Sequence, residues 1–313
     1  MSKCIYKYVG HNYLDMVIGS GDHATLKCSY PKDFNDPYEL FLTVDFKEQP
    51  EVLAFYADVV GNLDQLPTTC FSRSPSVIPM WAHYAQNLQG FAIEFDEAML
   101  GDSFKESGFG DVDYRDSTDD DLTDMLYRAY AIGKMRYIYL LRKGVFSAAY
   151  YTKATCWSYE LERRMIVRQS ETRSVGDLIL MDVPWNCVTS LICGPRVSPE
   201  TISAIRDKAS KLGCGYFELK IGRTSAVPFF LDLEGHTFTF NGTNIEQSSN
   251  FCSSCKEPLA AGSELCSWCQ IDDSHKSEAA TRNTYRMLDH YGLLEDYITG
   301  MDDISRRHRK RDI

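Results

Sequence analysis

Four cysteines in the C-terminal part constrain this chain more than any other feature. They form two pairs, Cys252-x2-Cys255 and Cys266-x2-Cys269, with ten residues between the pairs. Two residues between thiolates let both sulfur atoms of a tight turn face one ion, and two such turns complete a tetrahedron. Because the segment is too small to bury a core of its own, metal binding would supply its folding free energy. The spacing predicts a structural zinc site, while rubredoxin-like iron and a redox pair remain alternatives.

The remaining cysteines and the N-terminus bear on the compartment. Seven of the eleven cysteines are scattered singly along the 313 residues, which argues against a disulfide framework. The opening residues MSKCIYKYVGHNY contain no apolar signal region. No stretch approaches the 18 consecutive apolar residues of a membrane span. We therefore expect a cytoplasmic protein with no membrane partner.

Charge is distributed unevenly. The formal net charge is −11, so the chain as a whole is not a basic nucleic-acid-binding protein. Residues 111–124 carry seven aspartates, and residues 306–311 (RRHRKR) carry five formal positive charges. Runs of this kind are usually a solvated loop and a frayed tail. A short basic tail also gains affinity for phosphate through counterion release.

The pattern along the chain predicts an α+β protein. Helix signals are clearest in residues 198–212, where Ser198 is a cap, Pro199 takes the first helical position and Gly213 ends the helix. Strands are expected at residues 4–9, 24–29, 69–72, 90–95, 178–194 (two strands), 215–221 and 227–233, and helices at 47–64, 80–87, 119–150 and 277–304. The expected domains are 1–245, a zinc ribbon at 246–272, and a helix with a basic tail at 273–313.

Several polar and aromatic clusters occur where a simple core would not need them. They are YKY at 6–8, FNDPYE at 34–39, CFS at 70–72, MWAHYA at 80–85, GFAIEF at 90–95 and WSYELERR at 157–164. Together they resemble a widespread bacterial family of unknown function marked by KY near the start, FNDPxE, CFS, MWxHYA, GFxIEF and WxxExExR. The resemblance covers roughly residues 4–170.

That family is in turn similar to the ADP-ribosyltransferases. Those enzymes share a basic residue on the first strand, a serine on a second strand, and a Glu-x-Glu before a late strand. The resemblance assigns these places to Lys7, to Ser72 or Ser29, and to Glu160 and Glu162. It implies a split sheet, mixed or antiparallel, with helices, and NAD as substrate. The chain departs from the pattern in having lysine where arginine or histidine is usual.

The chemistry expected of the two glutamates does not depend on this resemblance. Cleavage of NAD to nicotinamide develops oxocarbenium character on the ribose, which a neighbouring carboxylate stabilises. We assign Glu162 to that role and Glu160 to orienting or deprotonating the acceptor. On one strand the two side chains would point to the same face. Their repulsion would raise the pKa of one of them, and Glu162→Gln is expected to abolish transfer without disturbing the fold.

The remaining candidates would bind the dinucleotide. These are Lys7 with Tyr8 for pyrophosphate or ribose, Asn35 and Ser72 for polar contacts, and Trp81, His83, Tyr84 and Trp157 for stacking or hydrogen bonding. Each has a structural alternative: Asn35 in a turn, the tryptophans as core anchors, His83 as a core histidine, and the glutamates with the neighbouring arginines as a surface ion-pair ladder.

Two functional hypotheses follow. In the first, the chain is an NAD-dependent ADP-ribosyltransferase whose zinc module and basic tail present a macromolecular acceptor, RNA or DNA before protein. Such bacterial enzymes commonly act as toxins or phage-defence effectors, which implies an antitoxin or chaperone as a further partner. In the second, the chain is a non-catalytic sensor or adaptor that binds a nucleotide or a phage component. A nuclease is a weaker third hypothesis, because the aspartate run lacks the glycine and terminal glutamate of a calcium loop.

Overall fold

The computed structural model describes residues 3–19, 21–37, 42–61 and 65–309. The chain divides into two compact units, Met1–Ser249 and Asn250–Ile313. Tyr38 and Glu39 of the FNDPYE cluster, and the last residues of the basic tail, lie outside the described residues.

A search of the described residues finds no helix with the length and apolar character needed to cross a membrane.

The described part of the first unit is built on a large mixed sheet of ten strands. Their order is β15(Ile245–Gln247), β14(Thr237–Phe240), β13(Phe229–Leu231), β12(Gly215–Lys220), β11(Val188–Cys193), β4(Phe91–Asp96), β1(Cys4–Val9), β3(Thr68–Ser72), β8(Glu162–Ile166) and β5(Gly108–Asp111). Neighbours are antiparallel except β11 and β12, which are parallel. These two are connected through α7(Pro199–Leu212), which has the expected Ser198 cap and the left-handed Gly213. The expected α+β class is confirmed.

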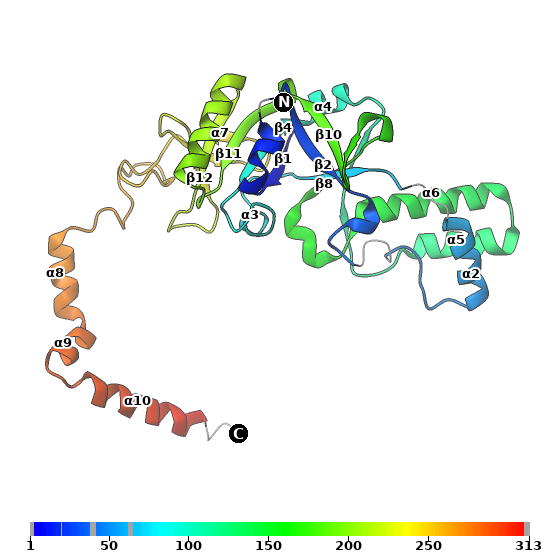
Figure 1. Cartoon of the computed structure of the whole chain (residues 1–313). Coiled ribbons are helices and arrows are strands. Elements are labelled where there is room, and N and C mark those ends of the chain that lie inside the picture. Colours follow the sequence, from blue (N-terminus) through cyan, green and yellow to red (C-terminus); the bar gives the residue numbers. More distant parts are fainter. Residues whose placement is uncertain (1–2, 20, 38–41, 62–64, 310–313) are drawn as a thin grey trace. The chain divides into compact units, whose positions relative to one another are not determined.

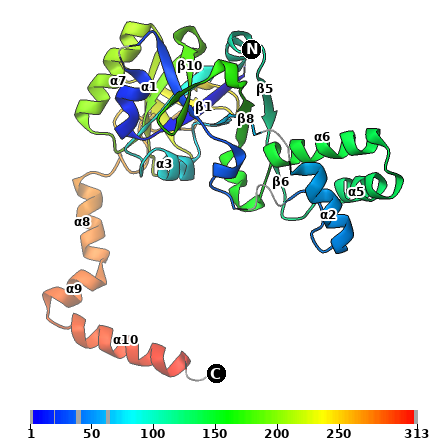
Figure 2. The ribbon, with the colours of Figure 1, turned by 45° about the vertical axis from the view of Figure 1, so that its right-hand side comes forward.

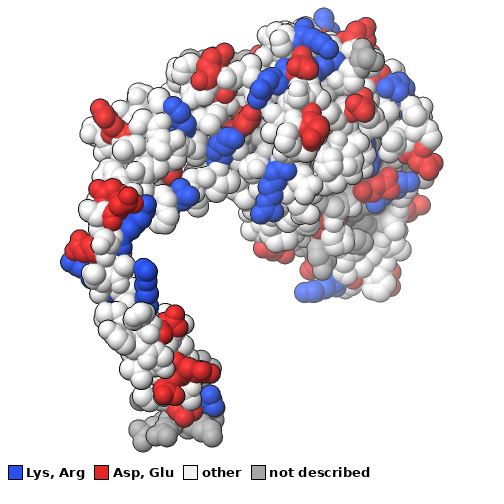
Figure 3. All heavy atoms as spheres, turned by 60° about the vertical axis from the view of Figure 1, so that its left-hand side comes forward, with Lys and Arg blue, Asp and Glu red and all other residues white. Residues whose placement is uncertain are grey.

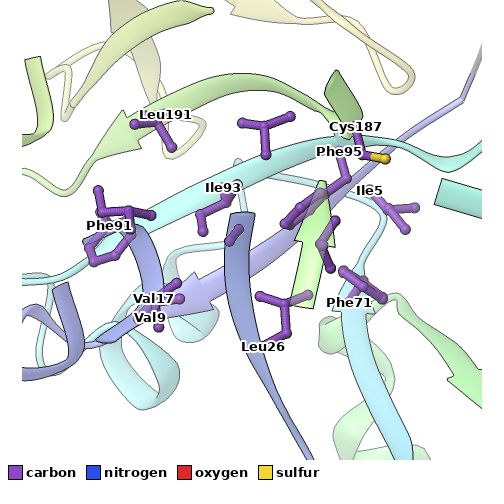
Figure 4. Packing of buried hydrophobic residues seen from close by; sticks show 14 of the residues in the cluster. Ile5, Val9, Val17, Leu26, Phe71, Phe91, Ile93, Phe95, Cys187 and Leu191 are labelled. Carbon is purple, nitrogen blue, oxygen red and sulfur yellow. The ribbon is translucent and has the colours of Figure 1, made fainter. Parts of the chain in front are cut away.

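A second sheet covers one face of the first. Among the described residues it has three antiparallel strands, in the order β2(His23–Cys28), β10(Leu178–Pro184) and β9(Arg173–Val175). The main core lies between the sheets and includes α1(Leu14–Ile18) and α7. Figure 4 shows side chains of β1, β2, β3 and β4 meeting there.

Strand β4 explains how the large sheet is covered on both faces. Phe91, Ile93 and Phe95 belong to the core between the sheets, whereas Ala92 belongs to a second cluster on the opposite face. That second cluster contains Trp81 of α3(Ile78–Tyr84). The period of two in the sequence is therefore real, although neither face of this strand is exposed.

Three helices of the first unit form a separate small core. They are α2(Pro50–Val60), α5(Asp120–Ile132) and α6(Met135–Tyr151), which lie together in both Figure 1 and Figure 2. The single helix expected over residues 119–150 is wrong. Gly133 adopts φ 65°, a left-handed conformation that ends α5, and Lys134 starts α6 from an extended conformation.

Shorter elements complete the first unit. They are η1(His11–Tyr13), η2(Pro31–Asp33), α4(Glu97–Ser103), β6(Asp113–Tyr114), β7(Thr152–Lys153), η3(Thr155–Glu160), η4(Gln169–Glu171) and η5(Trp185–Cys187), with β6 and β7 paired in parallel. Asp119 of the aspartate run accepts a bond from the Leu122 amide and caps α5. Part of that run therefore has a structural role.

The described part of the second unit, residues 250–309, contains the four-cysteine segment and three helices. The helices are α8(Asp273–Arg282), α9(Thr284–His290) and α10(Leu294–Arg309). The single helix expected over 277–304 is wrong. Asn283 caps a new helix by accepting from the Arg286 amide, and Gly292 at φ 68° interrupts the chain again.

Candidate active site and metal centre

A cavity of about 480 Å³ lies in the first unit. Its walls come from β1, β2, β3, β7, β8, β10, α1 and α3, together with residues of η1, η2 and η3 and the residues that follow η2. The charged side chains among its lining residues are Lys7, Lys27, Asp33, Lys153, Glu160, Glu162 and Arg164. A volume of this size is typical of small-molecule sites.

Glu162 begins β8 opposite Ser72 of β3, and its carboxylate is buried. Arg164 binds it with two parallel hydrogen bonds, Nε to Oε1 at 2.9 Å and a terminal nitrogen to Oε2 at 2.9 Å. Burial favours the protonated form, but the charge and hydrogen bonds of Arg164 outweigh it and lower the pKa of Glu162 to about 2. Glu162 is therefore a fixed negative charge.

Glu160 reaches the same cavity from a different element. It ends η3 rather than lying on β8, and Leu161 between the two glutamates is left-handed at φ 48°. The physical reason given for their common direction, alternation along one strand, is therefore wrong. Both still meet the amine of Lys153, at 2.6 Å from Glu160 Oε2 and 3.4 Å from Glu162 Oε2.

The environment of Glu160 differs from that of Glu162. Burial raises the pKa of Glu160, and although Lys153 and the hydroxyl of Tyr84 oppose this effect, the net shift is upward. Tyr84 donates to Glu160 Oε1 at 2.5 Å. A pair of carboxylates with pKa values pushed apart suits one to proton transfer and the other to charge stabilisation.

Lys7 projects from β1 into the cavity. Its amine donates to Thr69 Oγ1 at 3.0 Å and to the main-chain oxygen of Cys70 at 2.8 Å. Burial lowers the pKa of Lys7, while the charge of Glu162 acts in the opposite direction. The amine and the two glutamates therefore share one cavity, as the sequence argument required.

Asn35, Tyr8 and Ser72 also line the cavity, as does Ser29, the other serine candidate. Asn35 donates to the Tyr84 hydroxyl at 2.5 Å. Ser72 donates to the main-chain oxygen of Glu160 at 2.7 Å, and Tyr8 to that of Ser74 at 2.7 Å. The hydroxyl groups of Ser72 and Tyr8 therefore bind main-chain atoms of the segments around the cavity.

Three other candidates are not among the lining residues. Trp81 is fully buried, and its indole donates to the main-chain oxygen of Pro75 at 2.8 Å. His83 is exposed and contacts the Tyr159 hydroxyl through Nδ1 at 3.0 Å. Trp157 lies with its ring 4.7 Å from the Lys153 amine.

Sequence reasoning missed the two cations that organise the site. Arg164 was considered only as part of a surface ladder, although its spacing of two from Glu162 on a strand places both on one face. The Phe34 ring lies 4.7 Å from the Arg164 guanidinium. Lys153 follows a helix and has no local signature, so no sequence signal singled it out.

The second unit contains the four-cysteine cluster. The Sγ atoms of Cys252, Cys255, Cys266 and Cys269 all lie within 4.8 Å of one another, and those of Cys255 and Cys266 are 3.7 Å apart. Tetrahedral zinc with Zn–S bonds of about 2.3 Å needs sulfur atoms roughly 3.8 Å apart. The cluster is therefore compatible with a structural metal ion. That the ion is zinc rather than iron stays a prediction.

Comparison with known proteins gives one match. Residues 80–165 match a family model described as a protein of unknown function (DUF2971). The expected resemblance to a family of unknown function is confirmed over this segment. The matched segment contains Tyr84, Lys153, Glu160, Glu162 and Arg164, all of which line the cavity. The resemblance to ADP-ribosyltransferases stays a prediction.

No curated protein and no solved structure matches the chain.

Proposed function

We propose that this chain is an enzyme that cleaves the bond between nicotinamide and ribose in NAD and transfers the ADP-ribose to a macromolecule. The supporting observation is the pair Glu160 and Glu162, buried in one cavity and with pKa values shifted in opposite directions. Hydrolysis or transfer at a glycosidic carbon uses two carboxylates in different protonation roles. Lys7 at the same cavity would attract the anionic part of the dinucleotide.

The proposed reaction follows from these roles. The C–N bond to nicotinamide breaks and its electron pair leaves with the nicotinamide nitrogen. Fixed negative charge on Glu162 stabilises the positive charge that develops on the ribose. An acceptor hydroxyl or amine forms the new bond to the same carbon, and its proton passes to Glu160.

The acceptor is proposed to be a nucleic acid rather than a protein. Four-cysteine modules commonly hold nucleic acid, and the basic run at 306–311 would add phosphate contacts. The face in Figure 3 shows Lys and Arg interspersed with Asp and Glu, so it adds no basic patch to this argument. A role as a toxin or defence effector belongs to the same proposal, and a growth defect on expression of the wild type but not of Glu160→Gln would support it.

The test is incubation with labelled NAD and total RNA, DNA or lysate, followed by measurement of released nicotinamide and mass spectrometry of the polymers. Glu160→Gln is the cleaner variant, because Lys153 keeps Glu162 as a partner. Glu162→Gln leaves the Arg164 charge buried without a carboxylate, so its unfolding must be measured in parallel. Glu106→Gln, at an exposed glutamate, is the matched control. Equal release and transfer by Glu160→Gln and wild type would refute the assignment.

One observation favours the alternative of a non-catalytic sensor. Both oxygens of Glu162 already accept from Arg164, so the ionised carboxylate has a cationic partner before any ligand binds. Calorimetry with NAD separates the two functions: binding without nicotinamide release, in the presence of every acceptor class, would favour the sensor.

A further inference from the structure

Lys153 is the point at which the charged side chains of the cavity converge. Its side chain is 3% exposed, and its amine lies 2.6 Å from Glu160 and 3.4 Å from Glu162. The same amine lies 3.4 Å from the Asn35 side-chain oxygen. A buried lysine with two carboxylates is a neutralising partner for both, whereas a lone buried ammonium would be costly.

These contacts close a hydrogen-bonded ring. Lys153 donates to Glu160 and to Asn35, Asn35 donates to Tyr84, and Tyr84 donates to Glu160. The backbone next to Lys153 is fixed as well, because the Ala154 amide donates to the Asp36 carboxylate at 3.1 Å. The ring connects segments that are far apart in the sequence. It orients Glu160 from two sides, because Lys153 binds Oε2 and Tyr84 binds Oε1.

We propose that Lys153 is the positioning residue of this site: its amine holds Glu160 and Glu162 at one point and favours the carboxylate form of Glu160, which accepts the proton. The inference rests on the proposed function for the identity of the proton donor. The ionisation of Glu160 itself can be measured without any substrate.

Several charged or titratable groups lie near Glu160. Tyr84 faces it from α3, and Tyr159 precedes it on η3. Glu162 acts from β8, where Arg164 is its own partner, and Tyr114 acts from β6. Burial and Glu162 disfavour the ionised form of Glu160, while Lys153 and Tyr84 favour it. Of these, Lys153 is the cation in direct contact, so its removal should leave Glu160 protonated to higher pH.

The proposed proton transfer requires the ionised form of Glu160. When the acceptor attacks the ribose carbon, its O–H or N–H bond breaks and the proton binds to a carboxylate oxygen of Glu160. A Glu160 that is already protonated cannot accept it. Loss of a positioned general base lowers rates by about 10²–10⁴-fold.

The experiment is a carboxyl ¹³C NMR titration of the full chain, with the Glu160 signal assigned by its absence in Glu160→Gln. The variants are Lys153→Met, Lys153→Gln and Lys153→Arg, and Lys143→Met on the exposed side of α6 is the control. We expect the Glu160 midpoint to move to higher pH in Lys153→Met and Lys153→Gln, and to stay near wild type in Lys153→Arg and Lys143→Met. If the Met variant does not fold, the Gln variant supplies the measurement, because an uncharged amide at this position can still donate a hydrogen bond.

An unchanged Glu160 midpoint in a folded Lys153→Gln or Lys153→Met variant would overturn the proposal. The rate profile gives a second readout: the acid limb of nicotinamide release should move to higher pH in the same two variants. If wild type releases no nicotinamide, the proposed function fails and the titration still decides the role of Lys153. If NAD is cleaved but the midpoint is indifferent to Lys153, this inference alone fails.

Discussion

The two faces of strand β8 carry ion pairs of the same residue types in different surroundings. On the inner face, Glu162 and Arg164 are 6% and 1% exposed, and they meet in the cavity. On the opposite face, called the outer face below, Arg163 pairs with Glu97 at 2.6 Å, and these side chains are 14% and 17% exposed. Asp111, which lies 3.4 Å from Arg163, is 60% exposed. The local sequence Glu-Arg-Arg places the two arginines on opposite faces of the strand but does not show which of them is buried.

The difference shows what burial does to a charge. On the inner face, water cannot replace a lost partner, so each charge depends on the others, and the pKa values of Glu160 and Glu162 shift in opposite directions. On the outer face, Asp111 is well exposed, so solvent competes with its contacts to Arg73 and Arg163, and such pairs contribute little. The inner network can hold a reactive protonation state, whereas the outer network can only add to stability.

The largest expected effect is from Arg164→Met. The change leaves Glu162 buried with Lys153 as its remaining cation and should lower the free energy of unfolding by about 3–5 kcal/mol. Urea denaturation followed by circular dichroism measures it. A loss below about 1 kcal/mol would mean that the inner network behaves like the outer one.

Acid should separate the two inner carboxylates. The pKa of Glu162 is about 2 in the folded chain against an ordinary 4.5, so its stabilisation is complete above pH 4.5 and is lost as the pH falls toward 2. Glu160 acts in the opposite sense: its raised pKa means that acid stabilises the folded form through this group. Because the folded form takes up this proton above pH 4.5, Glu160→Gln should lose the stabilisation that wild type gains through this group as the pH falls toward 4.5. Thermal unfolding between pH 7 and 4 measures it, and an identical pH dependence of the variant and wild type in that range would contradict the assignment.

On the outer face, Asp111→Asn should cost less than about 1 kcal/mol. Arg73 and Arg163 both retain Glu97 as a partner after this change. The same urea experiment applies. A cost comparable to that of Arg164→Met would erase the distinction between the two faces.

The smallest expected effect is the response to salt. At 1 M salt the screening length falls to about 3 Å, so the difference between Asp111→Asn and wild type should shrink further. The difference between Arg164→Met and wild type should persist, because the inner pairs are shielded from solvent ions. Urea titrations at about 0.1 and 1 M NaCl compare the two; equal salt sensitivity would count against the contrast.

Local signals in the sequence were sufficient for several elements. The strand over residues 4–9 follows from its apolar and aromatic residues, and the helix after Ser198 from its cap, its proline and its terminal glycine. The same approach missed the break at Gly133, because residues on both sides have good helical patterning. A single left-handed residue outweighed a long periodic pattern there.

The candidate site was only partly predictable. Lys7, Asn35, Tyr84, Glu160 and Glu162 were named from sequence clusters and do line one cavity. Trp81 was named for the same reason but is in the core, because a large aromatic beside polar residues looks the same in both settings. Lys153 was missed because its partners are distant in the chain.

The sequence by itself determined the four-cysteine cluster, whose ligands lie within one short segment and are recognisable by spacing alone. Only the tertiary structure decided that Glu160 and Glu162 meet Lys153, that Arg164 fixes one carboxylate, and that Asn35 and Tyr84 orient the other. The physical reason is that the four ligands of the cluster are close together along the chain, so their spacing in the sequence specifies it. The cavity is specified by burial, which removes water from charges that segments far apart in the chain bring together.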